Sequence, residues 1–146
     1  MTYRIIAAGK TSHAYAKTGI EEYLKRLKRY GKFELHHVKD GDSEVVSKRL
    51  MEAAKGALIV AMDERGKDLD SYEFASQMRE WTDDPTIKSV CFLIGASDGH
   101  TEALRKEARY LLRLSKMTMM HELALLVLLE QIYRGQTILK GEPYHR

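Results

Sequence analysis

The feature of this 146-residue chain that most constrains its fold is a regular alternation of short apolar runs with longer amphipathic runs. Each apolar run is flanked by glycine or charged turns, as expected for a strand that helices cover on both faces. Strands separated by helices pair in parallel by default. We therefore predict a single α/β domain with a mostly parallel central sheet, with strands at Arg4–Ala8, Phe33–Val38, Ala57–Asp63 and Ser89–Ile94.

Runs with helical periodicity follow each of these strands. The first helix is predicted to open at Thr18, because Thr18-Gly19-Ile20-Glu21 has the spacing of a capping box, and to end before Gly31. Other helices are expected between the strands and after the last of them. The predicted helices are Thr18–Tyr30, Ser43–Lys55, Asp70–Trp81, Thr101–Arg109 and Met119–Arg134.

The helix predicted at Met119–Arg134 is apolar around almost its whole circumference. A helix of this kind is buried on more than one side. In a domain of this size one side can face the sheet of its own chain, and a second subunit most simply covers the other. We therefore predict a homodimer.

Composition restricts the setting of the protein more than its ligand. The single Cys91 lies within an apolar strand pattern, where a buried and inert thiol is expected, and this use of cysteine is typical of a reducing compartment. The N-terminus has no signal-peptide pattern, and Leu123–Leu129, the most apolar stretch, is far shorter than the ~20 residues of a membrane span. We expect a cytoplasmic protein with no membrane partner. The formal net charge of +3 permits a phosphate-bearing partner without requiring one.

Two glycine-containing turns match nucleotide-binding motifs only in part. Ala8-Gly9-Lys10-Thr11 lacks the first glycine of a P-loop, because Arg4 stands five positions before Gly9, and we interpret it as a polar turn. Gly95-Ala96-Ser97-Asp98-Gly99 follows a strand and precedes a helix, at the edge of the sheet where α/β proteins bind ligands. It does not have the Gly-x-Gly-x-x-Gly pattern, and an ordinary strand-to-helix turn explains it equally well.

Basic and histidine residues give weak signals. His36 and His37 are neighbours on a predicted strand, so their rings point to opposite faces and cannot share a metal. No other cluster has the spacing of a zinc site, and we predict no metal. His121 is a reserve catalytic candidate, although a histidine at that position more often bonds to backbone. The first predicted helix carries a basic stripe formed by Lys25, Lys28, Arg29 and Lys32. A solvated helix face is a simpler explanation of this stripe than a nucleic-acid contact.

The chain ends on three side chains that are able to do chemistry, Tyr144, His145 and Arg146. Chain ends are usually frayed and inert. A phenol, an imidazole and a guanidinium in this place either have no role or are ordered for use by another surface. These residues by themselves leave both interpretations open.

Five blocks in a fixed order resemble the bacterial SPOUT-class methyltransferases that methylate N3 of a pseudouridine in 23S ribosomal RNA. The resemblance spans the chain and extends to Gly9-Lys10 after the first strand and to the helix around Glu22–Leu27. The order and spacing of five separate blocks make chance a poor explanation. The blocks are Asp63-Glu64-Arg65-Gly66-Lys67, Phe92-Leu93-Ile94-Gly95, Leu114-Ser115-Lys116-Met117-Thr118, Leu129-Glu130-Gln131-Ile132-Tyr133-Arg134 and Gly141-Glu142-Pro143-Tyr144-His145-Arg146.

The resemblance implies a deep C-terminal trefoil knot, a rare exception to unknotted topology, whose loops bind S-adenosylmethionine. A glycine admits close approach of such a ligand, and loops between elements offer backbone groups to an adenine edge. The substrate implied is ribosomal RNA, either free or in an assembled ribosomal subunit. The positions that match the cofactor contacts of the family are Met62, Gly95, Leu114, Ser115, Lys116, Met117, Thr118 and Met119.

The resemblance also implies that the tail of one subunit reaches the cofactor pocket of the other. We predict direct in-line methyl transfer without a metal or a covalent enzyme intermediate, so that positioning does most of the work. The N3 imide must lose a proton, and His145 is the first candidate for the base or for the group that stabilises the imidate. Tyr144 is the second candidate, and Arg146 is expected to hold a phosphate or the developing anion.

Four features depart from the family pattern. Ala96 replaces a second glycine, Met119-Met120 replace a Phe-Pro pair, and the segment Lys39–Lys55 is shorter. Leu125 stands where an arginine is typical, and the loss of that cation is expected to weaken an RNA contact or an intersubunit contact. Two alternatives therefore stay open: a SPOUT methyltransferase that acts on another RNA such as transfer RNA, and a nucleotide- or RNA-binding domain without catalysis.

Overall fold

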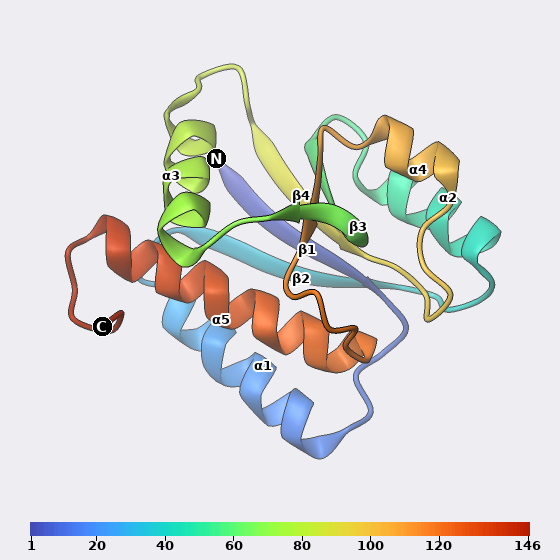
Figure 1. The fold of residues 1–146 in the computed structure, drawn as a ribbon, viewed down its shortest axis with the longest axis horizontal. Helices are drawn as coiled ribbons and strands as arrows, with labels where there is room; N and C mark the ends of the chain where they lie inside the picture. The colour runs from blue at the N-terminus through green and yellow to red at the C-terminus, as the bar shows by residue number, and fades with distance from the viewer.

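The computed structural model describes all 146 residues, and its strands and helices alternate along the whole chain (Figure 1). The strands are β1 (Thr2–Ala8), β2 (Lys32–Val38), β3 (Leu58–Asp68), β4 (Ser89–Ile94) and β5 (Tyr110–Arg113). The helices are α1 (Ala14–Leu27), α2 (Ser43–Ala53), α3 (Ser71–Asp83), α4 (Glu102–Glu107) and α5 (His121–Leu139).

The five strands form one sheet in the order β2-β1-β4-β3-β5, and every neighbouring pair is parallel. Helices α1, α3 and α5 cover one face, and α2 and α4 cover the other (Figure 1). Successive strand residues serve opposite faces: on β4, Phe92 packs against Phe74 and Trp81 of α3, whereas Cys91 and Leu93 join the core under α2 and α4. The predicted single α/β domain with a parallel sheet is confirmed, and the trefoil knot stays a prediction.

The fifth strand and the second half of β3 are absent from the predicted elements. Strand β5 has only four residues, and β3 continues past a bulge between Met62 and Lys67 into a charged segment that pairs with β5. Short or charged segments of this kind carry no clear alternation of apolar and polar residues. At Gly66 the backbones approach so closely that a Cβ would lie 2.5 Å from the carbonyl carbon of Leu112. This close approach explains why the residue in the Asp63–Lys67 block is a glycine.

Helix α1 begins at Ala14, so the capping box predicted at Thr18 is wrong. A carboxylate from α5 performs the capping instead: Glu122 accepts hydrogen bonds from the backbone N–H groups of Ser12 at 2.8 Å and His13 at 2.9 Å. The side chains of the same two residues also bond to this carboxylate, at 2.9 and 2.8 Å. The bonds from His13 and Ser12 lower the pKa of Glu122 to about 2. The start of α1 is thus set by a residue far along the chain.

Helix α5 lies between α1 and α3 and packs on the sheet, which accounts for much of its apolar circumference (Figure 1). A Cβ at Gly19 of α1 would lie 2.7 Å from Leu126, and one at Gly135 would clash with Met78 of α3. Neighbouring helices of the same chain therefore bury two of its sides. The helix continues to Leu139, past its predicted end. None of the helices combines the length and the hydropathy that a membrane crossing requires.

Candidate active site

A cavity of about 630 Å³ lies at the carboxyl ends of β4 and β5 and at the bulge in the middle of β3, beside the first turn of α5. Parallel α/β proteins bind ligands at this edge of the sheet, and the volume is typical of a small-molecule site. Of the eight residues predicted to contact a cofactor, Lys116 is exposed and does not line the cavity. The other seven do line it: Met62, Gly95, Leu114, Ser115, Met117, Thr118 and Met119.

A neighbouring histidine explains why residue 95 is a glycine. A Cβ at Gly95 would lie 2.8 Å from Nδ1 of His100, whose side chain is buried. The Nε2–H of His100 donates to the carbonyl oxygen of Leu93 at 3.2 Å, and burial lowers the pKa of the imidazole, which favours the neutral ring. Its Nδ1 has no hydrogen-bond partner. An unpaired buried acceptor costs free energy, which a donor group on a ligand in this cavity would recover.

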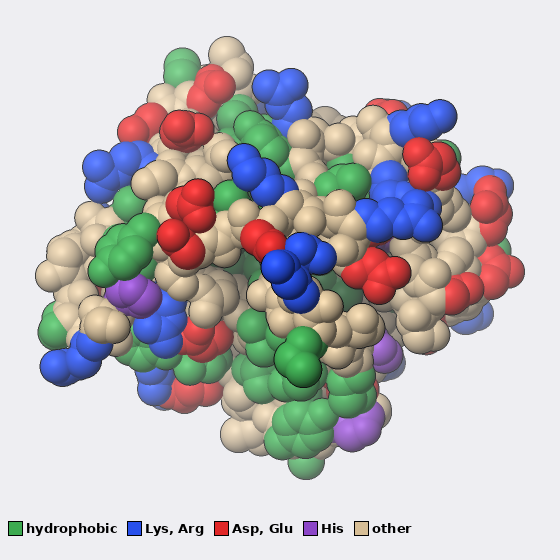
Figure 2. Space-filling model, viewed as in Figure 1, with side chains coloured by type: hydrophobic (Ala, Val, Ile, Leu, Met, Phe, Trp, Pro, Cys, Tyr) green, Lys and Arg blue, Asp and Glu red, His purple; other side chains and the backbone are tan.

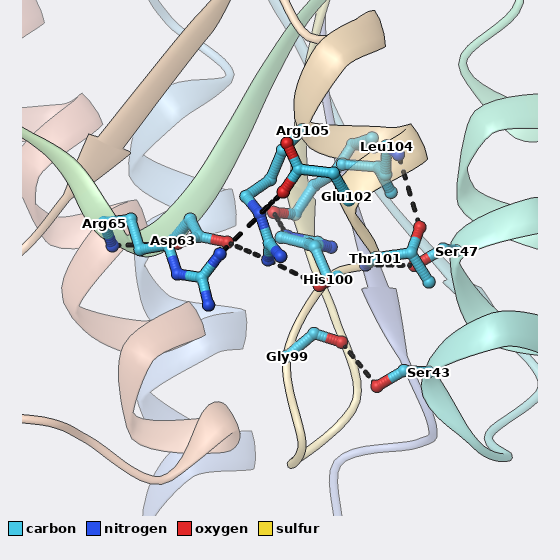
Figure 3. Close-up of polar contacts among 11 residues, drawn as sticks. Ser43, Ser47, Asp63, Arg65, Gly99, His100, Thr101, Glu102, Leu104 and Arg105 are labelled. Atoms are coloured by element: carbon cyan, nitrogen blue, oxygen red, sulfur yellow. Dashed lines mark hydrogen bonds and ion pairs between the residues drawn. The ribbon is translucent and has the colours of Figure 1, made fainter.

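A polar network holds the loop on which His100 lies (Figure 3). Asp63, near the carboxyl end of the first half of β3, pairs with Arg105 of α4 at 3.3 Å. Arg105 also donates to the backbone carbonyl oxygen of His100 at 2.6 Å. From α2, the hydroxyl of Ser43 donates to the carbonyl oxygen of Gly99 at 2.8 Å. Three elements thus fix this wall of the cavity. His100 and Arg105 are not among the predicted site residues, because only the fold brings them together.

The opposite wall is the loop between β5 and α5, residues Leu114–Met119. Just before it, the guanidinium of Arg113 makes two hydrogen bonds to Asp68, at 2.6 and 2.9 Å, which ties the end of β5 to the end of β3. Inside the loop the hydroxyl of Ser115 accepts a bond from the backbone N–H of Met117 at 3.0 Å. The Met117 side chain is 81% exposed. The loop therefore offers backbone groups and a polarizable apolar side chain, both of which suit an aromatic ligand.

The three predicted catalytic residues lie at the other end of α5. His121 begins this helix and lines the cavity, whereas Tyr144, His145 and Arg146 follow its last turn (Figure 1). A helix of 19 residues spans roughly 28 Å. None of the three tail residues lines the cavity. The tail therefore contributes no side chain to the cavity of its own chain.

The tail is docked on the helices of its own chain. The hydroxyl of Tyr144 donates to Glu130 at 2.8 Å and lies 3.2 Å from the hydroxyl of Tyr23. Its ring packs edge-to-face with that of Tyr133, with 4.7 Å between the centroids. Burial and the bonds to Tyr23 and Glu130 raise the pKa of Tyr144 well above the usual range of a phenol. The residue is therefore a neutral phenol whose proton points at a carboxylate, which makes it a poor base.

His145 is held between two side chains. Its Nδ1 lies 3.0 Å from Nη1 of Arg134, and its ring stands perpendicular to that of Tyr72, with 4.7 Å between the centroids. Arg134 makes two bonds to Glu130 one turn earlier on α5, at 2.9 and 3.3 Å, and these bonds raise the pKa of its guanidinium. Tyr144 and His145 thus share one support, the Glu130–Arg134 pair. Arg146 is exposed at the end of the chain.

The chain matches, over residues 1–145, the sequence model of a family described as predicted SPOUT methyltransferase. It belongs to the SPOUT methyltransferase family. A relative from Thermus thermophilus is 42% identical over 146 residues, an alignment that covers all of this chain and 99% of that protein. One from Deinococcus radiodurans is 38% identical over 149 residues, with the same coverage. Both relatives are named ribosomal RNA large subunit methyltransferase H.

Solved structures share the fold of this SPOUT methyltransferase. A probable methylase family protein from Haemophilus influenzae superposes with a TM-score of 0.62 at 13% identity and covers 99% of this chain and 70% of that one. The tRNA (m1G37) methyltransferase of Aquifex aeolicus gives 0.59 at 13% identity, with 100% and 75% covered. At such low identity these likenesses concern the fold. The roles predicted for the cavity and tail residues stay predictions.

The weaker sequence motifs of this SPOUT methyltransferase have structural explanations. Gly9 has a φ of 74° in the turn after β1, a conformation that glycine adopts readily. His36 bonds to Glu34, and His37 bonds to the carbonyl oxygen of Gly9, so the two rings have separate partners. No three His, Cys, Asp or Glu side chains are grouped so that they could hold a metal ion.

Proposed function

We propose that this SPOUT methyltransferase transfers a methyl group from S-adenosylmethionine to N3 of a pseudouridine in large-subunit ribosomal RNA. The observation that carries the proposal is the grouping of Met62, Gly95 and the Leu114–Met119 loop around one cavity, although they come from three separate parts of the chain. The full-length relatives named as ribosomal RNA large subunit methyltransferases support the substrate class.

The residues of the cavity fit the proposed cofactor. Its volume suits a nucleoside-sized ligand, the Leu114–Met119 loop offers backbone and apolar contacts, and Nδ1 of His100 is an acceptor without a partner. When bound, S-adenosylmethionine supplies a methyl group on a positively charged sulfur. Met62 and Leu114 would flank the purine, and the loop fixed by Asp63 and Arg105 would hold the other wall in place.

We propose further that the working form is a homodimer. The tail docks on Glu130 and Arg134 of its own chain and does not line the cavity of that chain, so in the proposed dimer the tail of a second copy reaches the cavity. Figure 2 shows hydrophobic side chains gathered over the starts of α1 and α5, where exposed Tyr15 and Met120 are in contact through a 3.2 Å hydroxyl–sulfur bond. An exposed apolar patch at the cavity rim is typical of an interface. We expect this dimer to work in the cytoplasm, on free or assembled ribosomal RNA.

The tail residues then have distinct roles at the cavity of the second subunit. Arg146 would hold a phosphate or the negative charge that develops on the imide. His145 would act on the imide group itself, and Tyr144 would hold the tail through its bond to Glu130. No metal takes part in the proposed reaction.

A filter assay with radiolabelled S-adenosylmethionine tests the function. Free 23S RNA, ribosomal subunits and transfer RNA are offered separately, and the methylated nucleoside is identified by mass spectrometry. We expect label in N3-methylpseudouridine of ribosomal RNA. Label in transfer RNA alone would favour the alternative RNA target, and tight RNA binding without label would favour a non-catalytic module.

Light scattering tests the dimer. We expect twice the chain mass at micromolar concentration, and Met120→Glu should shift the protein toward monomer because Met120 is exposed in the single chain. Leu126→Glu is not a suitable probe, since Leu126 packs against α1 of its own chain. A monomeric mass for the parent protein would overturn the dimer and the tail-to-partner arrangement with it.

A further inference from the structure

We infer that Arg134 is a positioning residue that fixes the tautomer of His145, so that His145 serves the reaction as a hydrogen-bond donor through Nε2–H and not as the proton acceptor. The inference deepens the proposed function and rests on it for the identity of the substrate. Its structural part concerns the contact between Arg134 of α5 and His145 of the tail, which exists without substrate.

The contact with Arg134 determines where the imidazole proton lies. A guanidinium has only donor groups, so Nδ1 of His145, 3.0 Å from Nη1, must be the acceptor. A neutral imidazole carries one N–H. The proton is therefore on Nε2, because a proton on Nδ1 would face another donor and the bond would be lost. The lone pair that could take a proton is already in use.

Arg134 is itself held firmly enough to impose this choice. Two bonds from its guanidinium reach the carboxylate of Glu130, at 2.9 and 3.3 Å, and its guanidinium carbon lies 4.8 Å from the centroid of the Tyr144 ring. Tyr144 also donates to Glu130. Turning Arg134 away from His145 would disturb a group fixed on two sides. Nη1 therefore remains directed at the imidazole.

The other neighbours of His145 also argue against a base. Tyr72, which stands perpendicular to its ring, is the second side chain that contacts it, and the carboxylate of Glu130 bonds to Arg134 and Tyr144. Histidine bases in enzymes are commonly oriented by a carboxylate that accepts the Nδ1 proton. Here a cation occupies that position, so the group presented to a substrate is the Nε2–H.

A donor is useful in the proposed reaction. N3 of the pseudouridine forms a bond to the methyl carbon while the carbon–sulfur bond breaks, the sulfur leaves as a thioether, and the N3 proton passes to water. Negative charge grows on the imide oxygens as that proton leaves. A positioned N–H that donates to one of these oxygens stabilises this charge, an effect worth roughly 10²–10³ in rate at comparable sites.

The tautomer is tested on the protein alone by long-range ¹⁵N–¹H NMR of its histidines at neutral pH. We expect an Nε2–H pattern for His145, whose signals are assigned by their loss in His145→Gln. His100, whose Nε2–H donates to Leu93, is the internal reference. Arg134→Met should release His145 into a mixture of tautomers and leave His100 unchanged. An Nδ1–H pattern in the parent protein, or an unaltered His145 in Arg134→Met, would overturn the inference.

Two substitutions test the donor role in the reaction. His145→Gln keeps an N–H donor that cannot act as a base, and His145→Leu removes both functions. We expect the Gln variant to keep activity within about 10-fold and to retain the parent pH profile, while the Leu variant loses about 10²–10³-fold. Equal losses in both variants would contradict the donor role of His145. If the parent protein transfers no methyl group to ribosomal RNA, the proposed function fails, and the NMR result still decides the tautomer.

Discussion

The two ends of α5 differ in how far their polar groups are satisfied. At the amino end, the cavity wall contains an unpaired buried nitrogen on His100 and the rim carries exposed methionines such as Met117. At the carboxyl end, Tyr144 and His145 each have a partner, Glu130 and Arg134. The amino end has a polar group that lacks a hydrogen-bond partner without a ligand. The carboxyl end has polar groups whose hydrogen bonds within the chain already fix their orientation.

In the proposed function, this difference separates cofactor binding from chemistry. A cofactor site needs free contacts, whereas a catalytic group works best when its orientation is fixed before the reaction. Because no tail residue lines the cavity of its own chain, the proposed site is completed by the tail of a second copy. Substitutions at the amino end should therefore change cofactor affinity, and those at the carboxyl end should change turnover.

Removal of the tail should give the largest effect. A truncation after Pro143 is expected to lower methylation of ribosomal RNA by about 10²–10⁴-fold, the range of a lost acid–base or charge-stabilising group. Cofactor affinity measured by calorimetry should stay at the parent value, because the tail does not line the cavity. A small decrease in melting temperature is expected, since Tyr144 loses its bond to Glu130. Full activity in the truncated protein would show that the tail is inert.

Complementation makes the same comparison sharper. Ser115→Trp places a large ring at the cavity wall and should abolish cofactor binding while leaving the tail intact. Refolding it in equal amounts with the truncated protein should restore about one quarter of parent activity, because half of the dimers carry one complete site of two. Each variant alone should be inactive. No recovery in verified mixed dimers would contradict a site built from two copies.

The local pattern of the sequence indicated one part of the cavity, and the family resemblance supplied Met62 and the Leu114–Met119 loop. A turn that follows a buried parallel strand lies at the ligand-binding edge of the sheet, so Gly95 could be placed there from its flanking pattern. The tail could be singled out only by residue type. Its distance from the cavity depends on the length and direction of α5, which extends to Leu139, and neither follows from the pattern of the last residues.

Contacts between distant parts of the chain could not be predicted. The cap on α1 comes from Glu122, more than a hundred residues away, and a local capping box at Thr18 was a plausible but wrong alternative. His100 fits under Gly95 only because the loop between them folds back. Strand β5 depends on its pairing with β3, so its four residues carry too little pattern of their own. Local rules describe elements well and tertiary partners poorly.

The next effect concerns the cavity wall. Gly95→Ala puts a methyl group against Nδ1 of His100 and is expected to destabilise the protein by about 1–3 kcal/mol, as overpacking does. His100→Ala should make room for that methyl group, so the double variant should be more stable than the sum of the single changes predicts. Denaturant unfolding of all four proteins measures the coupling. Additive losses would contradict a steric role for His100 at residue 95.

A smaller effect is expected where Glu122 caps α1. Its folded pKa of about 2 lies below the usual 4.5, so its ionised form stabilises the fold fully above pH 4.5, and this stabilisation is lost as the pH falls toward 2. Glu122→Gln should therefore lower the free energy of unfolding at neutral pH, and the difference from the parent should shrink between pH 4.5 and 2.

The matched control is Glu21→Gln, which changes an exposed carboxylate on α1. It should alter stability little at any pH, as surface substitutions usually do. The same titration applied to both variants separates the cap from the general effect of removing a negative charge. A pH-independent loss in Glu122→Gln would show that the carboxylate acts through its shape and not through its charge.

The smallest effect is expected at the last residue. Arg146 is exposed, so Arg146→Ala should leave stability and cofactor affinity unchanged and act only on RNA. Loss of one phosphate contact reduces the slope of log affinity against log salt by about 0.7–0.9. The comparison variant is Lys25→Ala, which removes an exposed cation of the basic stripe. Arg29 and Lys32 of that stripe are less suitable, because they already form ion pairs within this chain, with Glu142 and Glu34. A reduced slope in Arg146→Ala but not in Lys25→Ala would place the RNA backbone at the tail, whereas the reverse would place it on α1 and remove Arg146 from the proposed site.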